Sequence, residues 1–326
     1  AVYSGSGDGP TVLIRCELDG LPIQEISAQS YRSKHPGRGH LCGHDGHMAM
    51  VAGLATQLNE QRPKRGRVVL LFQPAEETGK GAAAVLADQR FAPLVPDFAF
   101  SLHNLPGLAK GRVSLCQGPA NCASRGMRIR LVGKTSHAAA PQDGISPAVA
   151  ISQLMPALTE LGSGGDLTDT YALVTVTHCQ MGEPTFGISP GEAQVLATLR
   201  TVTDGAMTRL VQRAERLVAD IVGAEGLKVN IEYDDAFVAC TNQSDAVSLL
   251  EQACKSAGCG SELMLTPQLW SEDFGQFSAV AKSAMFWLGS GESQPQLHNP
   301  DYDFPDAILP VGTGILARAI DLVLNS

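Results

Sequence analysis

Alternation between apolar strand patterns and amphipathic helix patterns restricts the fold of this sequence more than any other feature. Residues 12–14 predict a strand, residues 47–58 a helix, and residues 68–72 a second strand that is apolar throughout. In the predicted helix, apolar residues recur at the spacing of one helix face: Val51, Leu54, Ala55 and Leu58. A helix at 81–87 and a strand at 98–102 continue the alternation. We therefore predict an α/β fold with a mostly parallel sheet covered by helices on both faces.

The order of elements changes in the middle of the chain. The patterns there run strand, helix, strand, strand, helix, strand, at residues 127–132, 146–161, 171–178, 193–201, 204–222 and 227–232. This is the order of a split βαβ, or ferredoxin-like, α+β domain. A strand at 284–288 and a helix at 308–324 then resume the earlier style. The length of 326 residues suits two domains. We predict a catalytic domain made of residues 1–121 and 236–326, with residues 122–235 inserted.

Composition excludes several classes of protein. The net charge of −9 and the absence of a dense Lys or Arg cluster argue against nucleic-acid binding, so a small-molecule substrate is expected. No run of 18 uncharged apolar residues predicts a membrane span. Eight cysteines are scattered without paired spacing, which favours a reduced, cytoplasmic setting. The chain starts without Met and enters a strand pattern at Thr11, which would fit a fragment of a longer protein.

Polar residues with useful chemistry follow the predicted strands. They are Glu17 and Asp19, Glu76 and Glu77, His103, and, after a loop, His298. Ligand and catalytic groups of open α/β sheets lie outside the carboxyl ends of the strands. We therefore expect these four stretches to converge on one crevice.

The densest polar stretch is Cys42-Gly43-His44-Asp45-Gly46-His47, in a glycine-rich loop directly before the predicted helix at 47–58. Thiolate and imidazole are good ligands for zinc-like ions, and the glycines allow the backbone to turn tightly so that both side chains face one point. A buried cysteine beside helix-capping residues is an equally good explanation of this stretch taken alone.

The adjacent carboxylates Glu76 and Glu77 follow a predicted buried strand. The ordinary explanation of such a pair is an acidic turn exposed to solvent. At neighbouring positions, one carboxylate can coordinate a metal while the other acts as a base on bound water. His103 and His298, each taken alone, would more often be ordinary histidines than ligands. His103 and His298 support a metal site only in combination with the other polar residues that follow the strands.

Six short motifs give the chain a family resemblance. They are residues 17–22 (ELDGLP), 42–47 (CGHDGH), 73–77 (QPAEE), 102–107 (LHNLPG), 136–139 (SHAA) and 271–274 (SEDF). In this order they resemble the aminoacylase and carboxypeptidase metallopeptidase superfamily. The most similar branch is the amidohydrolases, which includes hippurate hydrolases, indole-acetyl-amino-acid hydrolases and N-acyl-L-amino acid amidohydrolases. The resemblance extends from about Thr11 to the end of the chain.

The resemblance implies a site with two divalent metal ions, zinc, manganese or cobalt. Its metal ligands would be Cys42, His44, Glu77, His103 and His298. Glu76 would be the general base on a metal-bound water, and Asp19 a catalytic carboxylate that orients a ligand. Five ligands with one bridging, together with a bridging water, fill two four-coordinate ions. The implied reaction is hydrolysis of the amide bond of N-acyl amino acids.

The resemblance also assigns roles to the inserted domain. It would serve as a lid and mediate a homodimer, with His137 reaching the active site of the partner subunit to help hold the oxyanion. Arg200 occupies a position where relatives place an arginine that pairs with the substrate carboxylate, and a guanidinium suits bidentate binding. An ordinary loop histidine and an ordinary exposed strand arginine are the alternatives for these two residues.

Other functions stay open at this point. A dipeptidase or carboxypeptidase would use the same metal site. A thiol hydrolase would use Cys42 as nucleophile, activated by His44 or His103. Two departures from the family pattern also allow a catalytically impaired binding protein: Glu17 stands where relatives mostly have Asp, and residues 187–190 (GISP) replace a loop that usually carries Asn.

Overall fold

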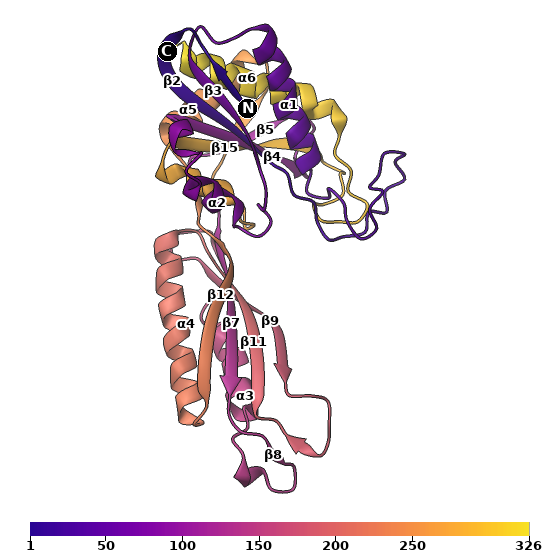
Figure 1. Ribbon diagram of the computed structural model, residues 1–326, viewed down its shortest axis with the longest axis vertical. Helices are drawn as coiled ribbons and strands as arrows, with labels where there is room; N and C mark the ends of the chain where they lie inside the picture. Colours follow the sequence, from indigo (N-terminus) through magenta and orange to yellow (C-terminus); the bar gives the residue numbers. More distant parts are fainter. Residues whose placement is uncertain (326) are drawn as a thin grey trace. The chain divides into compact units, whose positions relative to one another are not determined.

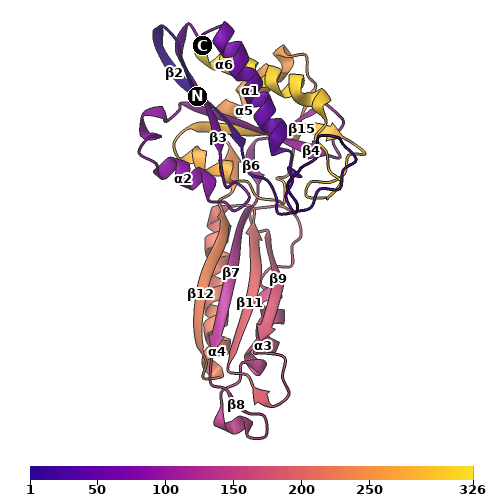
Figure 2. The same cartoon turned by 45° about the vertical axis from the view of Figure 1, so that its right-hand side comes forward.

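The computed structural model describes residues 1–325, and these form two compact units, each treated by itself. Unit 1 contains Ala1–Ala120, Cys240–Pro267 and the chain from Glu272 onward. Unit 2 contains Asn121–Ala239 and the short segment Gln268–Ser271. Figure 1 and Figure 2 show the chain coloured along its sequence.

A seven-stranded sheet is the centre of unit 1 within the described residues, in the order β1-β3-β2-β4-β15-β5-β14. Its strands are β1 (Val2–Ser4), β2 (Gly7–Glu17), β3 (Arg65–Gln73), β4 (Phe98–Pro106), β5 (Val113–Cys116), β14 (Ser261–Met264) and β15 (Lys282–Gly291). The four pairs β2–β3, β2–β4, β4–β15 and β5–β14 are parallel, whereas β1–β3 and β5–β15 are antiparallel. The predicted mostly parallel sheet is confirmed.

Helices cover both faces of this sheet because its strands are apolar on both sides. The helices are α1 (His44–Glu60), α2 (Gly81–Ala87), α5 (Ser244–Ser256) and α6 (Leu309–Leu324), with short 3₁₀ turns η1 (Ala92–Leu94), η3 (Asp273–Ala279) and η4 (Asp306–Ile308). Val12 and Ile14 pack in one core with buried residues of α1, α5 and α6. Leu13, between them, faces a separate core with Ala82 of α2 and Phe277 of η3. Successive residues of β2 thus point to opposite faces of the sheet and pack against different layers of helices.

Unit 2 is an α+β domain of the predicted split βαβ type, as Figure 1 shows. Its main elements are β7 (Ala123–Val132), α3 (Ala148–Glu160), β9 (Ala172–Met181), β11 (Glu192–Thr201), α4 (Asp204–Ala224) and β12 (Lys228–Phe237). The sheet order is β12-β7-β11-β9, with every neighbouring pair antiparallel. The predicted fold class, with an α+β insert, is confirmed.

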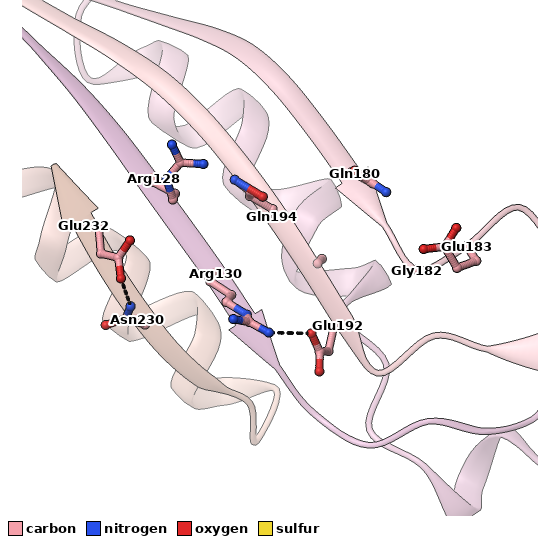
Figure 3. A pocket seen from close by; sticks show the side chains of 10 residues that line it. Arg128, Arg130, Gln180, Gly182, Glu183, Glu192, Gln194, Asn230 and Glu232 are labelled. Atoms are coloured by element: carbon pink, nitrogen blue, oxygen red, sulfur yellow. Dashed lines mark hydrogen bonds and ion pairs between the residues drawn. The ribbon is translucent and has the colours of Figure 1, made fainter. Parts of the chain in front are cut away.

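The two faces of the unit 2 sheet differ in polarity. Met127, Ile129 and Leu131 of β7 are buried in a core with residues of α3 and α4. Arg128 and Arg130 alternate with them and lie on the face that the helices leave uncovered (Figure 3). Arg128 pairs with Asp234 at 3.0 Å and Arg130 with Glu192 at 2.9 Å. On this polar face, ion pairs therefore connect side chains of neighbouring strands.

Several short elements had no prediction. β1, β5 and β14 extend the unit 1 sheet, the pair β6 (Gly118–Asn121) and β13 (Cys240–Asn242) adds a small ladder, and β8 (Ser136–His137) pairs with β10 (Ile188–Ser189) beside η2 (Pro141–Asp143). The segment Gln268–Ser271 joins unit 2 because Cys122 donates a backbone hydrogen bond to Gln268 and the Asn121 side chain donates one to Trp270. Asp306–Leu324 is long and apolar enough, by length and composition alone, to cross a membrane; core helices also meet this test, and half of the segment is buried.

Candidate metal centre

The site lies in unit 1, beyond the carboxyl ends of parallel strands. Glu17 ends β2, and Glu76 and Glu77 follow β3 after a tight turn at Ala75, a non-glycine residue with a φ of 57°. His103 is on β4, beside β2. A φ in the left-handed region is uncommon for alanine, and the Ala75 carbonyl accepts the backbone N–H groups of Lys80 and Gly81 at 3.3 and 3.0 Å. After this turn, Glu76 and Glu77 lie at the carboxyl ends of the strands, where the sequence predicts the site.

Two glycines let the motif at 42–47 fold against its surroundings. α1 begins at His44, three residues earlier than predicted, and Gly43 before it has a φ of 88°. A Cβ on Gly43 would lie 2.3 Å from Oδ1 of Asn104, and one on Gly46 would lie 2.5 Å from the Phe304 ring. Both positions therefore require glycine. The glycines place Cys42 and His44 on either side of the helix start.

The five sequence-predicted ligands converge in overlapping groups. Cys42, His44 and His103 offer ligand atoms that all lie within 4.8 Å of one another, and so do Cys42, Glu77 and His298. Cys42 Sγ is 3.5 Å from His103 Nε2, and His298 Nε2 is 3.5 Å from Glu77 Oε1. Since Cys42 belongs to both groups, the arrangement matches two cations that share one thiolate.

The hydrogen bonds of His44 and His103 select the tautomer that binds a metal through Nε2. His44 Nδ1 lies 3.0 Å from the backbone oxygen of Asp19, and His103 Nδ1 lies 2.8 Å from that of Asn104. A carbonyl only accepts, so each Nδ1 carries the proton and each Nε2 keeps its lone pair. Among residues 1–325, buried His44 Nε2 has no hydrogen-bond partner. This donor set fits divalent ions of the zinc type.

The pKa shifts of the proposed ligands also favour metal binding. Burial lowers the pKa of His44 and of His103, which favours the neutral imidazole that binds metal. Burial raises the pKa of the Cys42 thiol, and Glu77 and Glu76 raise it further. A thiolate at Cys42 therefore requires a cation beside it. Burial also opposes ionisation of Glu77, but His298 and His44 bring its pKa below the usual value.

His298 and Asp19 are fixed through the backbone. His298 has a φ of 67° and donates its N–H to Leu41 at 2.8 Å, next to Cys42. The carboxylate of Asp19 accepts the backbone N–H of Glu77 at 2.8 Å. Asp19 thus contacts one proposed ligand by its side chain and another, His44, by its carbonyl.

A buried cluster of charges surrounds Glu76, and the sequence did not predict it. Arg15 Nη2 pairs with Glu272 at 2.9 Å and with Asp273 at 2.5 Å, and Arg15 also pairs with Glu17. Oxygens of Glu76, Glu272 and Asp273 lie within 4.8 Å of one another. Burial raises the pKa of Glu76, and Glu272 is the largest neighbouring charge that raises it further. The cluster's signals in the sequence were a single arginine inside the apolar strand β2 and the motif at 271–274, which contains Glu272 and Asp273.

A second unpredicted network supports the histidines. His47 Nδ1 lies 2.7 Å from Glu17, and its Nε2 accepts the backbone N–H of Asn104 at 3.1 Å. The Asn104 side chain donates to the Tyr302 hydroxyl at 2.6 Å. The His47 ring is 4.8 Å from the His103 ring, edge to face. His47 therefore bonds to protein groups on both nitrogens, and its place in the motif at 42–47 is structural.

The two remaining predicted site residues lie in unit 2. His137 is exposed on β8, where its Nδ1 accepts the N–H of Ala139 at 3.0 Å and where β8 pairs with the altered loop at Ile188. Arg200 Nη1 donates to the Leu269 carbonyl at 2.6 Å and to the Ser271 hydroxyl at 2.9 Å. Arg200 thereby fastens the segment Gln268–Ser271 to β11.

Known proteins resemble the chain over its whole length. Residues 13–322 match the family Peptidase family M20/M25/M40. An N-acetyl-L-cysteine deacetylase of Bacillus subtilis (strain 168) is 29% identical over 327 residues, which are 100% of this chain and 77% of the relative. The IAA-amino acid hydrolase ILR1-like 5 of Arabidopsis thaliana is 28% identical over 326 residues, 97% of this chain and 74% of the relative.

A solved structure agrees with the fold. The crystal structure of a dinuclear metal binding peptidase from the M20 family of Bacillus subtilis superimposes with a TM-score of 0.83 at 26% identity, covering 100% of this chain and 84% of that one. The family match, at residues 13–322, includes most of each of the three segments of unit 1 and all of unit 2. The chain therefore belongs to peptidase family M20/M25/M40.

Proposed function

We propose that this protein is a metal-dependent amidohydrolase that cleaves the amide bond of N-acyl amino acids. The observation that carries the proposal is the pair of ligand groups that share Cys42. The relatives named as a deacetylase of N-acetyl-L-cysteine and a hydrolase of IAA-amino acids support the class of substrate. The net charge of two divalent ions against one thiolate and one ligating carboxylate would attract the substrate's carboxylate.

The five ligands would hold two divalent ions. Cys42 would contribute to both, with His44 and His103 on one side and Glu77 and His298 on the other. Bound ions of this kind polarise a substrate carbonyl and lower the pKa of water. The lone pairs that His44 and His103 keep on Nε2 are what this role requires of the protein.

Glu76 would act as the general base. Its carboxylate is buried beside the ligands, with Oε2 4.0 Å from His44 Nε2. A raised pKa brings a carboxylate nearer to the value at which it can both take and return a proton. Glu76 would take a proton from the attacking water and pass it to the leaving nitrogen. Asp19 would hold the Glu77 backbone in place during this transfer.

Roles for unit 2 belong to the same proposal. We infer a homodimer in which His137, exposed on β8, would help to hold the oxyanion in the partner's site. Arg200 would pair with the substrate carboxylate only if its guanidinium gave up Leu269 or used its other nitrogens. Zinc, manganese and cobalt all suit the mixture of thiolate, imidazole and carboxylate. A reduced cytoplasmic protein suits the free buried cysteines.

Metal content and turnover test the proposal together. Two ions per chain, loss of turnover with a chelator, and recovery with zinc, manganese or cobalt are expected. N-acetyl and N-benzoyl amino acids should be hydrolysed faster than dipeptides. Preference for dipeptides would assign a dipeptidase instead. Full turnover after removal of all metal, with rapid inactivation by a thiol reagent, would assign a thiol hydrolase.

The substitution Glu76→Gln tests whether Glu76 is the general base. It should lower kcat by about 10²- to 10⁴-fold, the usual contribution of general base catalysis, while metal content stays at the parent value. Unchanged turnover would remove Glu76 from the mechanism. No turnover by the metal-loaded parent on any acyl-amino acid would identify a binding protein of this family.

A further inference from the structure

A cavity of about 710 Å³ lies within unit 1 and is lined in part by chain neighbours of the proposed metal ligands. This volume falls in the range of small-molecule sites. Gly20, His40 and Asp45 line it, and they lie one or two residues along the chain from Asp19, Cys42 and His44 respectively. On another side of the cavity, Phe304 packs its ring 6.2 Å from that of His47. A molecule in this cavity would thus contact segments of the chain that also carry residues of the reacting centre.

Charged side chains of both signs line the cavity. The cations are Arg32, Lys34 and Arg38, and the carboxylates are Glu25, Asp45 and Asp303. Some of these groups already have partners. Glu25 accepts from Ser27 at 2.6 Å and from the Ser33 backbone at 2.8 Å, Asp303 accepts from the Tyr31 hydroxyl at 3.0 Å, and Arg32 donates to the Ser27 carbonyl at 3.4 Å.

Three of the charges have no such partner. Within the part of the chain that the structure describes, the side chains of Lys34, Arg38 and Asp45 form no hydrogen bond or ion pair. Nδ1 of His40 is buried in the same wall and also has no partner among these residues. Two cations and one carboxylate on the wall of one cavity suit a ligand that carries both an anionic and a cationic group.

The acidic side of the cavity is crowded with like charge. Burial raises the pKa of Asp303, and the charges of Asp306, Asp45 and Glu25 raise it further, although the hydrogen bond from Tyr31 opposes them. A cationic group of a ligand placed between Asp45 and Asp303 would relieve this repulsion.

We propose that this cavity binds a free α-amino acid, with its ammonium group facing Asp45 and Asp303 and its carboxylate facing Lys34 and Arg38. The link to catalysis rests on the proposed function, in which the free amino acid is a product. Hydrolysis adds water across the amide and breaks the carbon–nitrogen bond, and the released amine takes up a proton. Since the acylated nitrogen of the substrate has no charge, Asp45 and Asp303 distinguish product from substrate.

Calorimetric titration of the metal-loaded and the chelator-treated protein tests this binding without any turnover. The probes are L-alanine and L-leucine. Propionate is the analogue without an ammonium group for both forms, and N-acetyl-L-alanine is a second analogue for the chelator-treated form alone, because the metal-loaded form would hydrolyse it. The amino acids should bind both forms of the protein, and the analogues at least about tenfold more weakly, because a charge-assisted hydrogen bond is lost. Equal affinity for amino acid and analogue would overturn the proposal.

Variants locate the site. Lys34→Gln and Arg38→Gln lie on exposed loop positions and should each weaken L-leucine binding about tenfold or more, in both forms of the protein. Asp45→Asn should reduce L-leucine affinity to that of the analogues. The matched control is Lys64→Gln, an exposed lysine outside the cavity, which should leave binding unchanged.

Two outcomes contradict the proposal in distinct ways. Binding that disappears on chelation but survives in Arg38→Gln and Lys34→Gln would place the amino acid on the metal ions. Absence of binding in both forms would exclude the site. Because calorimetry needs no catalysis, a protein that binds L-leucine but hydrolyses no acyl-amino acid would contradict the proposed function alone.

Discussion

At the scale of single residues, Arg15 decides whether the site's buried charges are tolerated. It is 1% exposed and balances Glu17, Glu272 and Asp273 in the interior. Burial would lower the pKa of Arg15, but these carboxylates raise it, so it stays charged. Removing one partner of a buried ion pair leaves an uncompensated charge, which is far more costly than breaking an exposed pair.

Arg15→Met should therefore destabilise the protein by about 3–5 kcal/mol in urea unfolding. Arg130→Met is the matched control, because Arg130 pairs with Glu192 on an exposed sheet surface, and it should cost less than about 1 kcal/mol. If the two substitutions had similar effects, the buried cluster would not depend on the charge of Arg15.

Glu272 predicts a dependence of stability on pH. Burial raises the pKa of Glu272 to about 7, against the opposing effect of Arg15. The unfolded chain loses this proton at about pH 4.3, whereas the folded chain keeps it to about pH 7, so stability from this group is full below the lower value and declines between the two. The decline for the parent should be about 4 kcal/mol over the whole range, with about two thirds of it between about pH 5 and about pH 7.5.

Urea unfolding of the metal-free protein at about pH 5 and about pH 7.5 measures this difference. Glu272→Gln should remove the decline, since an amide does not ionise. A decline of the same size in Glu272→Gln would assign it to other groups of the cluster, such as Asp273, whose pKa burial also raises.

At the scale of elements, the start of α1 depends on Gly43. Gly43→Ala would force an alanine into a φ of 88° and press its Cβ against Asn104. Destabilisation by about 1–3 kcal/mol and a lower metal content are expected, because Cys42 and His44 flank this position. Gly53→Ala within the same helix is the control: its Cβ would meet Thr313 at 3.4 Å, an ordinary contact, and should be neutral or stabilising. Urea unfolding and metal analysis of both variants test this prediction, and equal effects of the two substitutions would contradict it.

The elements that the sequence predicted are the ones with a strong local pattern. The strands at 12–14 and 68–72 are apolar throughout, and the structure extends them to β2 and β3. β1, β5 and β14 have three or four residues each and are held by strands far away in sequence, such as β3 for β1. A short segment whose stability comes from distant partners has no periodicity to detect.

The same distinction applies to the site. Cys42, His44 and Glu77 belong to dense local motifs, and the structure places them together with His103 and His298. Arg15 gives only a weak local signal, a charge inside an apolar strand, and Tyr302 gives none, because most of their contacts are with residues about 60 to 260 positions away along the chain. Ligands can be predicted from spacing, whereas the groups that orient them emerge only from the fold.

At the scale of the whole molecule, the division into two units predicts how metal binding changes stability. Each unit has its own apolar core. The five proposed ligands all lie in unit 1, and a ligand stabilises the part of a protein that binds it by an amount that grows with concentration, about 2.7 kcal/mol at a hundredfold excess over Kd. Calorimetry should show two transitions, with only the unit 1 transition shifted upward by zinc or manganese.

Variants assign the two transitions. Gly43→Ala should lower only the transition that responds to metal. Thr203→Ala removes the side-chain cap of α4 in unit 2, where Thr203 accepts the N–H of Ala206, and should lower only the other by the equivalent of about 1 kcal/mol. The segment Gln268–Ser271, which Arg200 fastens to β11, is a covalent path by which the units could melt together. A single transition that moves with metal in every variant would mean that this path couples the units into one cooperative fold.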